Sequence, residues 1–169
     1  YLNTRGNKKG NPATGSAADE NYAREVMQLF SIGLYELNAD GSNKLNASGQ
    51  PIETYDQAAI TSLAKVFTGY DFDATGSTPT TNPLQVKNRM VLTASLHDTG
   101  AVTFLGNTIP AGASGPAALT QALDIIFNHP NVGPFIGKQL IQRLVTSNPS
   151  PAYVARVASA FNNGAGVRG

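Results

Sequence analysis

The sequence predicts a mainly α-helical domain with a small β-hairpin or turn appendage. Apolar residues recur at helical spacing in five segments, most connections between these segments are short, and runs typical of β-strands are brief. We therefore expect about five amphipathic helices in one orthogonal or bundle-like domain. A chain of 169 residues with 41% hydrophobic residues is large enough to bury such a core.

The first predicted helix covers residues 19–34. At about 100° per residue, one side of this helix is apolar and carries Tyr22, Val26, Leu29, Phe30 and Gly33. Asp19 is the expected N-cap, because its carboxylate can accept a hydrogen bond from the first turn. The second helix begins at Thr54, which forms a capping box with Gln57, and it ends at Gly69.

Between these helices, two similar runs begin at Leu37 and Leu45, each reading Leu-Asn-Ala-x-Gly. Their turn dipeptides predict a hairpin or paired turns near residues 35–53. Residues 71–113 are rich in loop-forming residues, with one β-like run near 90–92.

Three further helices are expected towards the end of the chain. They begin at Pro116, Val132 and Pro151, and the first of them ends where Asn128 precedes His129 and Pro130. We expect a lead-in over residues 1–18, one helical domain over 19–163, and a frayed end of a truncated segment over 164–169. His129, at a helix end, is expected to act as a C-terminal cap.

Composition excludes several classes of function. The chain has no cysteine, and no apolar run is long enough to predict a membrane span. The net charge of +1 hides an acidic stretch, since residues 19–73 hold nine of the eleven acidic residues. No basic stripe indicates a nucleic-acid partner. We expect no cofactor and no metal, because only two histidines occur and the calcium-loop pattern lacks its final glutamate.

The carboxylates remain as candidates for catalysis. Paired Asp and Glu side chains hydrolyse glycosidic bonds when one donates a proton and the other stays ionised. Glu20 and Glu25 lie about 140° apart on a helix, so a working pair needs one of them with a loop carboxylate such as Asp98. A structural ion-pair network around Arg24 and Glu25 is the alternative. His97 and Asp98 also have an alternative role, which is to stabilise a turn.

Four motifs follow one another along the chain: ENYAREVMQLFSIGL at 20–34, AKVFTGY at 64–70, HDTG with TFLG across 97–106, and HPNVGPFI through LVTSNPSP across 129–151. In this order they resemble the DUF1800 family, bacterial proteins of unassigned function. Tyr70 stands where the family commonly has Trp, and Gly137 where it has a larger polar residue. Family members are longer and typically exported. The resemblance therefore implies an internal fragment of an extracytoplasmic or secreted protein.

The resemblance carries over the polar motif residues Glu20, Asn21, Arg24, Glu25, His97 and Asp98. We expect catalytic roles for Glu25, Glu20, Asp98 and His97, and substrate binding by Arg24, Asn21, Tyr70 and Tyr35. Two hypotheses follow. The first is a carboxylate-dependent hydrolase, most plausibly a glycoside hydrolase acting on a polysaccharide, for which exposed tyrosines would stack on sugars. The second is a non-catalytic cell-envelope or assembly module that docks on missing segments of the parent chain.

Overall fold

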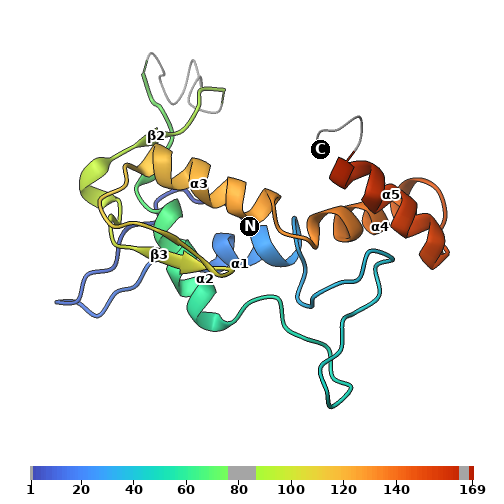
Figure 1. Ribbon diagram of the computed structural model, residues 1–169. Helices are drawn as coiled ribbons and strands as arrows, with labels where there is room; N and C mark the ends of the chain where they lie inside the picture. The colour runs from blue at the N-terminus through green and yellow to red at the C-terminus, as the bar shows by residue number, and fades with distance from the viewer. Residues whose placement is uncertain (1, 76–86, 164–167) are drawn as a thin grey trace. The chain divides into compact units, whose positions relative to one another are not determined.

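The computed structural model describes residues 2–75, 87–163 and 168–169 (Figure 1). Within these residues there are five α-helices and two antiparallel pairs of short strands. The five predicted helices and a small β part are confirmed, whereas a mainly helical class with orthogonal or bundle-like packing stays a prediction. The chain divides into two compact units, which we call unit 1 (Tyr1–Arg24 and Gln57–Ala122) and unit 2 (Glu25–Asp56 and Leu123–Gly169).

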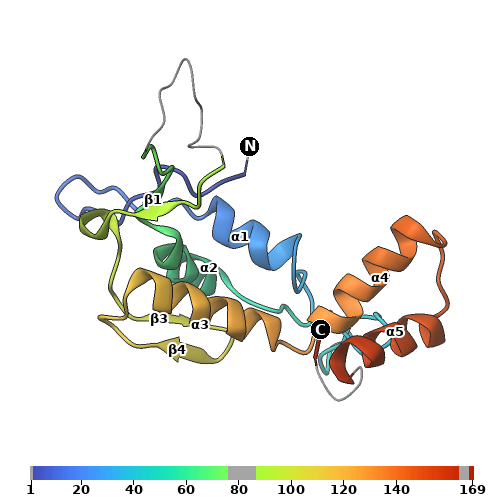
Figure 2. The ribbon, with the colours of Figure 1, turned by 90° about the horizontal axis from the view of Figure 1, so that it is seen from above.

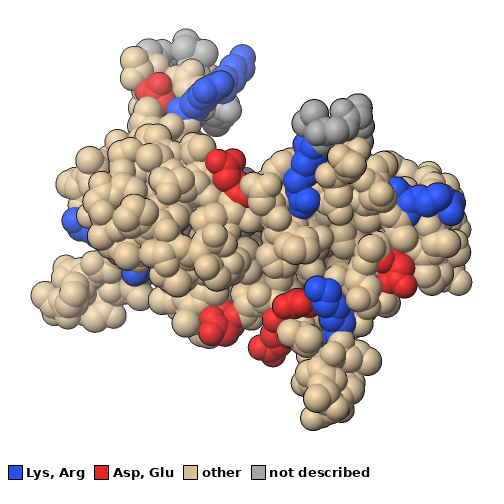
Figure 3. Space-filling view, viewed as in Figure 1, with Lys and Arg blue, Asp and Glu red and all other residues tan. Residues whose placement is uncertain are grey.

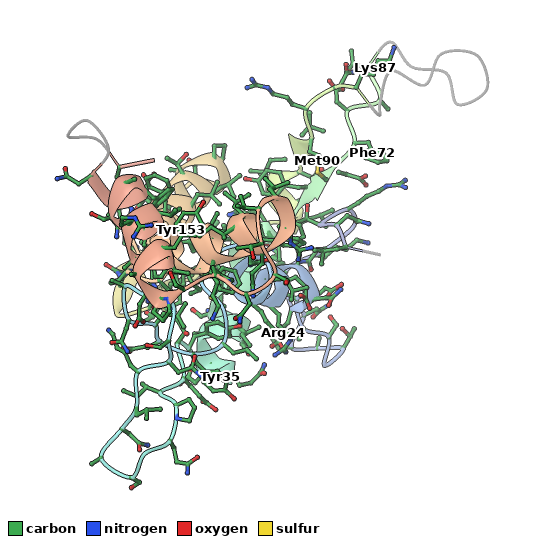
Figure 4. The ribbon with its side chains drawn as sticks, turned by 90° about the vertical axis from the view of Figure 1, so that its right-hand side faces the viewer. Arg24, Tyr35, Phe72, Lys87, Met90 and Tyr153 are labelled. Carbon is green, nitrogen blue, oxygen red and sulfur yellow. The ribbon has the colours of Figure 1, made fainter. Side chains whose placement is uncertain are left out.

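Unit 1 contains most of the strands and is built around helix α2. In chain order, the elements that lie in or enter this unit are α1 (Asn21–Gln28), α2 (Gln57–Ala64), a 3-10 turn (Lys65–Phe67), β1 (Tyr70–Asp71), β2 (Val91–Leu92), a second 3-10 turn (Ala94–Leu96), β3 (Val102–Phe104), β4 (Asn107–Ile109) and α3 (Gly115–Phe127). β1 pairs with β2 and β3 with β4. Figure 2 shows β3 beside α2, and the two elements pack together. Phe72 directly follows β1, and Met90 directly precedes β2; both residues are labelled in Figure 4.

Helix α1 ends at Gln28, six residues before the predicted end. The Ser31 hydroxyl donates a hydrogen bond to the Val26 carbonyl, and Gly33, with a φ of 75°, donates its N–H to the Met27 carbonyl. These bonds satisfy carbonyls that another helical turn would have used. Leu29 and Phe30 are consequently 52% and 59% exposed rather than part of a buried helix side.

The first residues are held against unit 1 by backbone and side-chain hydrogen bonds. The Asn7 side chain accepts a bond from the Asp19 N–H at 2.8 Å and donates one to the Asp19 carbonyl at 3.2 Å. The Lys9 N–H donates to the Leu96 carbonyl at 2.8 Å. This segment therefore has fixed neighbours, although its sequence shows no apolar period.

Unit 2 contains α4 (Val132–Leu144) and α5 (Pro151–Asn163), which pack on each other. Both begin at the residues that the sequence indicated. The repeated Leu-Asn-Ala motif forms two successive turns closed by the bridges Leu37↔Asn43 and Leu45↔Pro51, eight residues apart. The predicted frayed end falls largely on residues 164–167, which lie outside the described residues.

Asn131 fixes the chain that follows α1. Its Oδ1 accepts a hydrogen bond from the Leu37 N–H at 2.9 Å, and its Nδ2 donates to the carbonyls of Ile32 at 2.9 Å and Tyr35 at 2.8 Å. The side chain is 1% exposed. Because it replaces three backbone partners that a helix or sheet would supply, Asn131 is the main polar anchor of this segment.

His129 follows α3, as expected, but its ring also takes part in the next turn. Its Nδ1 accepts a hydrogen bond from the Asn131 N–H at 3.2 Å. Burial lowers the pKa of the imidazole below 6.5; the Glu36 carboxylate opposes this shift, and the charges of Lys44 and Arg168 add to it. The folded state of unit 2 therefore disfavours the protonated ring.

Acidification is expected to destabilise unit 2 through His129. The unfolded chain binds a proton near pH 6.5, whereas the folded ring takes it up at lower pH, so stability falls as pH drops below about 6.5. Urea unfolding near pH 8 and near pH 5.5 measures this effect, expected to be below about 1 kcal/mol. His129→Asn keeps an acceptor without the titration, and its stability should change less between the two pH values. Equal changes in both proteins would contradict the assignment.

Candidate functional site

Glu20, just before α1, is the centre of a polar network with one side of α2. Its Oε1 accepts a hydrogen bond from the Thr61 hydroxyl at 2.6 Å, and its Oε2 accepts one from Gln57 Nε2 at 2.7 Å. Arg24 Nη2 forms an ion pair with the same Oε2 at 3.3 Å and also donates to Gln57 Oε1. Glu20 and Arg24, two predicted site residues, therefore contact the side of α2 that carries Gln57 and Thr61. The sequence did not associate these α2 residues with them.

Asp98 is positioned by Thr68, which is fully buried. The Thr68 hydroxyl donates to the Lys65 carbonyl at 2.6 Å and accepts from the Asp98 N–H at 2.8 Å. The Asp98 carboxylate in turn accepts a bond from the Gly100 N–H at 2.8 Å. These bonds fix both the backbone and the side chain of Asp98, which lies in the loop between the second 3-10 turn and β3.

His97 supports the same loop from within the core. It is 3% exposed, and its Nδ1 lies 2.9 Å from the Thr68 carbonyl oxygen. Since a carbonyl only accepts hydrogen bonds, Nδ1 carries the proton and donates it. This hydrogen bond holds His97 in place and so helps to position the neighbouring Asp98. Because the His97 ring is buried, a substrate in solution does not contact it.

A hollow of about 450 Å³ lies in unit 1 beside Asp98. Its charged and hydroxylic lining comes from Ser16, Thr61, Lys65 and Asp98, and the rest comes from Gly10, Pro12, Gly15, Ala17 and Ala18. The Lys65 ammonium group donates to the Ala101 carbonyl at 3.1 Å. Asp98 is thus the one predicted carboxylate among the lining residues, and Glu20 is bonded to the lining residue Thr61 without lining the hollow itself.

The remaining predicted residues have different surroundings. Asn21 is exposed, and its N–H donates to Asp19 Oδ1 at 2.8 Å, which agrees with the predicted capping role of Asp19. Burial raises the pKa of the Tyr70 phenol, so this group stays neutral, and its ring lies edge-on to that of His97 at 6.4 Å. Arg24 and Tyr35 are labelled in Figure 4.

Glu25 and Tyr35 belong to unit 2. Glu25 Oε2 is buried and forms no hydrogen bond with any described residue, whereas Tyr35 is 40% exposed. Tyr35 lines a groove of about 400 Å³ together with Gln28, Leu29, Gly33, Leu34, Leu37, Asn43, Phe135 and Gln139. The structure therefore places Tyr35 at an apolar surface of its own unit.

Sequence reasoning missed Thr61, Lys65 and Thr68. Lys65 and Thr68 lie inside the AKVFTGY motif, and Thr61 precedes Lys65 by four residues, which is one helical turn. This spacing predicts that the side chains of Thr61 and Lys65 lie on one side of a helix. The contacts of Thr61 with Glu20 and of Thr68 with Asp98 could not be predicted from neighbouring residues.

The described residues hold no group of three or more His, Asp or Glu side chains arranged for a metal ion. In the same residues, no helix has both the length and the apolar character needed to cross a membrane. Charged side chains are scattered on the face shown in Figure 3, where most of the surface is uncharged.

Comparison with known proteins places the chain in a family. A family model described as "Protein of unknown function (DUF1800)" matches residues 1–167. No curated protein and no solved structure matches the chain. Since the family model spans nearly all of the 169 residues, the protein belongs to the DUF1800 family.

Proposed function

We propose that the hollow of unit 1 is the active site of an extracytoplasmic hydrolase that cleaves glycosidic bonds in a polysaccharide. The observation that supports this proposal is that Asp98 lines the hollow and that Glu20 is bonded to Thr61, another of its lining residues. Most glycoside hydrolases require two carboxylates, and the proposal assigns these two. The extracytoplasmic location rests on the resemblance to exported family members.

Asp98 suits the base or nucleophile. Its carboxylate accepts a hydrogen bond from the Gly100 N–H, which fixes its orientation, and it lines the hollow directly. In this role it either takes a proton from the attacking water or attacks the anomeric carbon itself. The bond from that carbon to the leaving oxygen breaks in the same step.

Glu20 is the candidate acid that protonates the leaving oxygen. It now accepts bonds from Arg24, Gln57 and Thr61, and the contact with Arg24 is the longest of the bonds to Oε1 and Oε2, at 3.3 Å. To act as the acid, Glu20 takes up a proton from solvent when the substrate displaces the Arg24 guanidinium, and it then transfers that proton to the leaving oxygen. His97 acts as a positioning residue for Asp98 because it is buried.

Release of reducing sugar from β-glucan and related polymers tests this proposal. Asp98→Asn and Glu20→Gln are each expected to lower the rate by at least about 100-fold, since each removes an acid–base group with little change in volume. Asp124→Asn, an exposed change on α3, is the matched control and should keep the wild-type rate. Absence of release by the wild type from every polymer, or full activity of Asp98→Asn, would refute the proposal.

A second candidate function is a non-catalytic envelope or assembly module. The apolar groove of unit 2 favours it, because Leu29, Leu34 and Tyr35 on its lining are 52%, 45% and 40% exposed. Such a surface is typical of a site for an apolar segment of a partner. Wild type is then expected to enhance the fluorescence of an apolar dye, and Leu29→Ser with Leu34→Ser to reduce it at least about twofold. A wild type that is monomeric in sedimentation and binds no dye would contradict this role.

A further inference from the structure

We propose that unit 1 recognises an anionic polysaccharide, whose carboxylated units bind through Lys8 and Lys9 in a second hollow next to the proposed active site. This inference rests on the proposed function and names its substrate class. Lys65 would contact the same polymer in the first hollow. Neither Lys8 nor Lys9 was a candidate from the sequence pattern.

The second hollow has a volume of about 470 Å³. It is lined by Lys8, Lys9, Gly10, Asn11, Pro12, Ser16 and Leu96. Gly10, Pro12 and Ser16 also line the hollow that contains Asp98. The two hollows therefore adjoin at the segment that contains these residues, and the inference is that one polymer contacts both.

The segment shared by the two hollows is ordered by its own hydrogen bonds. The Asn11 N–H donates to the Ser16 carbonyl at 2.9 Å, the Asn11 side chain accepts from the Ala13 N–H at 3.0 Å, and the Thr14 N–H donates to the Asn11 carbonyl at 3.1 Å. The Lys9 N–H is bonded to the Leu96 carbonyl. Because the backbone is fixed, the two lysine side chains start from defined positions, which lowers the entropic cost of binding.

The lysines of the two hollows have no carboxylate partner within the described part of the chain. The ion pairs found there join Arg5 to Asp71, Arg24 to Glu20 and Lys44 to Glu36. The second hollow has no acidic lining residue, and Lys8 and Lys9 are exposed. Two lysines that line one hollow without an acidic residue favour an anionic ligand such as a sugar carboxylate.

A polysaccharide fits this surface better than a nucleic acid. Neither hollow has an aromatic lining residue, so neither a base nor a sugar ring can stack there, and recognition depends on charge and hydrogen bonds. Asp98 in the first hollow would also repel a continuous phosphate backbone. An acidic polymer with one charge per sugar can place a glycosidic bond, rather than a charge, next to Asp98.

Calorimetric titration of the whole chain with tetragalacturonate, with uncharged cellotetraose as the comparison, tests this inference. Wild type is expected to bind the acidic probe at least about tenfold more tightly. Lys8→Gln with Lys9→Gln should weaken that binding roughly tenfold, and 0.5 M NaCl should weaken it as well. Arg143→Gln with Arg156→Gln removes the same charge from exposed positions of unit 2 and should leave the affinity within about twofold.

The outcomes separate this inference from the proposed hydrolase. Equal affinity for the two tetrasaccharides, unchanged affinity in the Lys8 and Lys9 variant, or tighter binding of oligothymidylate than of tetragalacturonate would overturn the inference. Cleavage of neutral β-glucan without tetragalacturonate binding would support the hydrolase and overturn the inference. Lysine-dependent binding of tetragalacturonate without release from any polymer would support anion recognition and overturn the hydrolase.

Discussion

Replacing Asn131 with alanine is expected to lower the free energy of unfolding of unit 2 by roughly 3 to 5 kcal/mol. The change removes three hydrogen bonds, to the Leu37 N–H and to the carbonyls of Ile32 and Tyr35, and leaves these groups without their partner. Each buried polar group that loses its partner costs about 1 to 3 kcal/mol, with partial compensation by water. Urea unfolding followed by circular dichroism measures the change.

Two further variants separate the hydrogen bonds from the volume of the side chain. Asn131→Leu fills the site but makes none of the bonds, so it is expected to be nearly as destabilising as Asn131→Ala. Asn148→Ala, at an exposed position, should cost less than about 0.5 kcal/mol. If Asn131→Ala unfolds at the same urea concentration as the wild type, Asn131 is not the anchor of this segment.

Gly69→Ala is expected to destabilise unit 1 by about 3 kcal/mol or more. Gly69 has a φ of 84°, which disfavours a side chain, and a Cβ there would lie 3.0 Å from the His97 nitrogen and 3.0 Å from the Thr93 oxygen. Both contacts are with backbone atoms, so a rotamer change cannot relieve them. The displacement would reach the loop that carries Asp98, so the proposed hydrolysis is expected to fall together with stability.

Gly112→Ala provides the matched control in the same unit. Gly112 has a φ of 82°, but a Cβ at this position meets nothing within 4 Å. It is therefore expected to cost only about 1 kcal/mol, from backbone strain. The difference between the two variants in the free energy of unfolding gives the cost of crowding at Gly69. Equal losses of stability would show that the close approach to His97 does not contribute to that cost.

Helices in the second half of the chain were predictable because their signals are local. Val132 and Pro151 begin α4 and α5 where apolar spacing and turn residues indicated. The end of α1 was not predictable in this way, since helical spacing continues through Phe30 while Ser31 and Gly33 terminate the helix. The strands β1 to β4 have two or three residues each, too few to show a period of two.

The same distinction between local signals and distant contacts applies to the candidate site. The sequence marked Glu20, Arg24 and Asp98 as unusual polar residues in ordered motifs, but it did not indicate their partners. Glu20 meets Thr61 across 41 positions of the chain, and Asp98 meets Thr68 across 30. Contacts at such separations depend on how the elements pack, so residue spacing within one or two helical turns does not record them.

By itself, the sequence determined the helices, the paired turns and the residue types available for chemistry, because these depend on neighbours within a few positions. Only the tertiary structure decided that His97 is buried, that Asp98 and Lys65 line one hollow, and that Asn131 bonds to Ile32 from 99 positions away. The physical reason is that a hydrogen bond or a cavity requires several distant segments to be fixed at once, and the free energy that fixes them comes from burial of the whole unit.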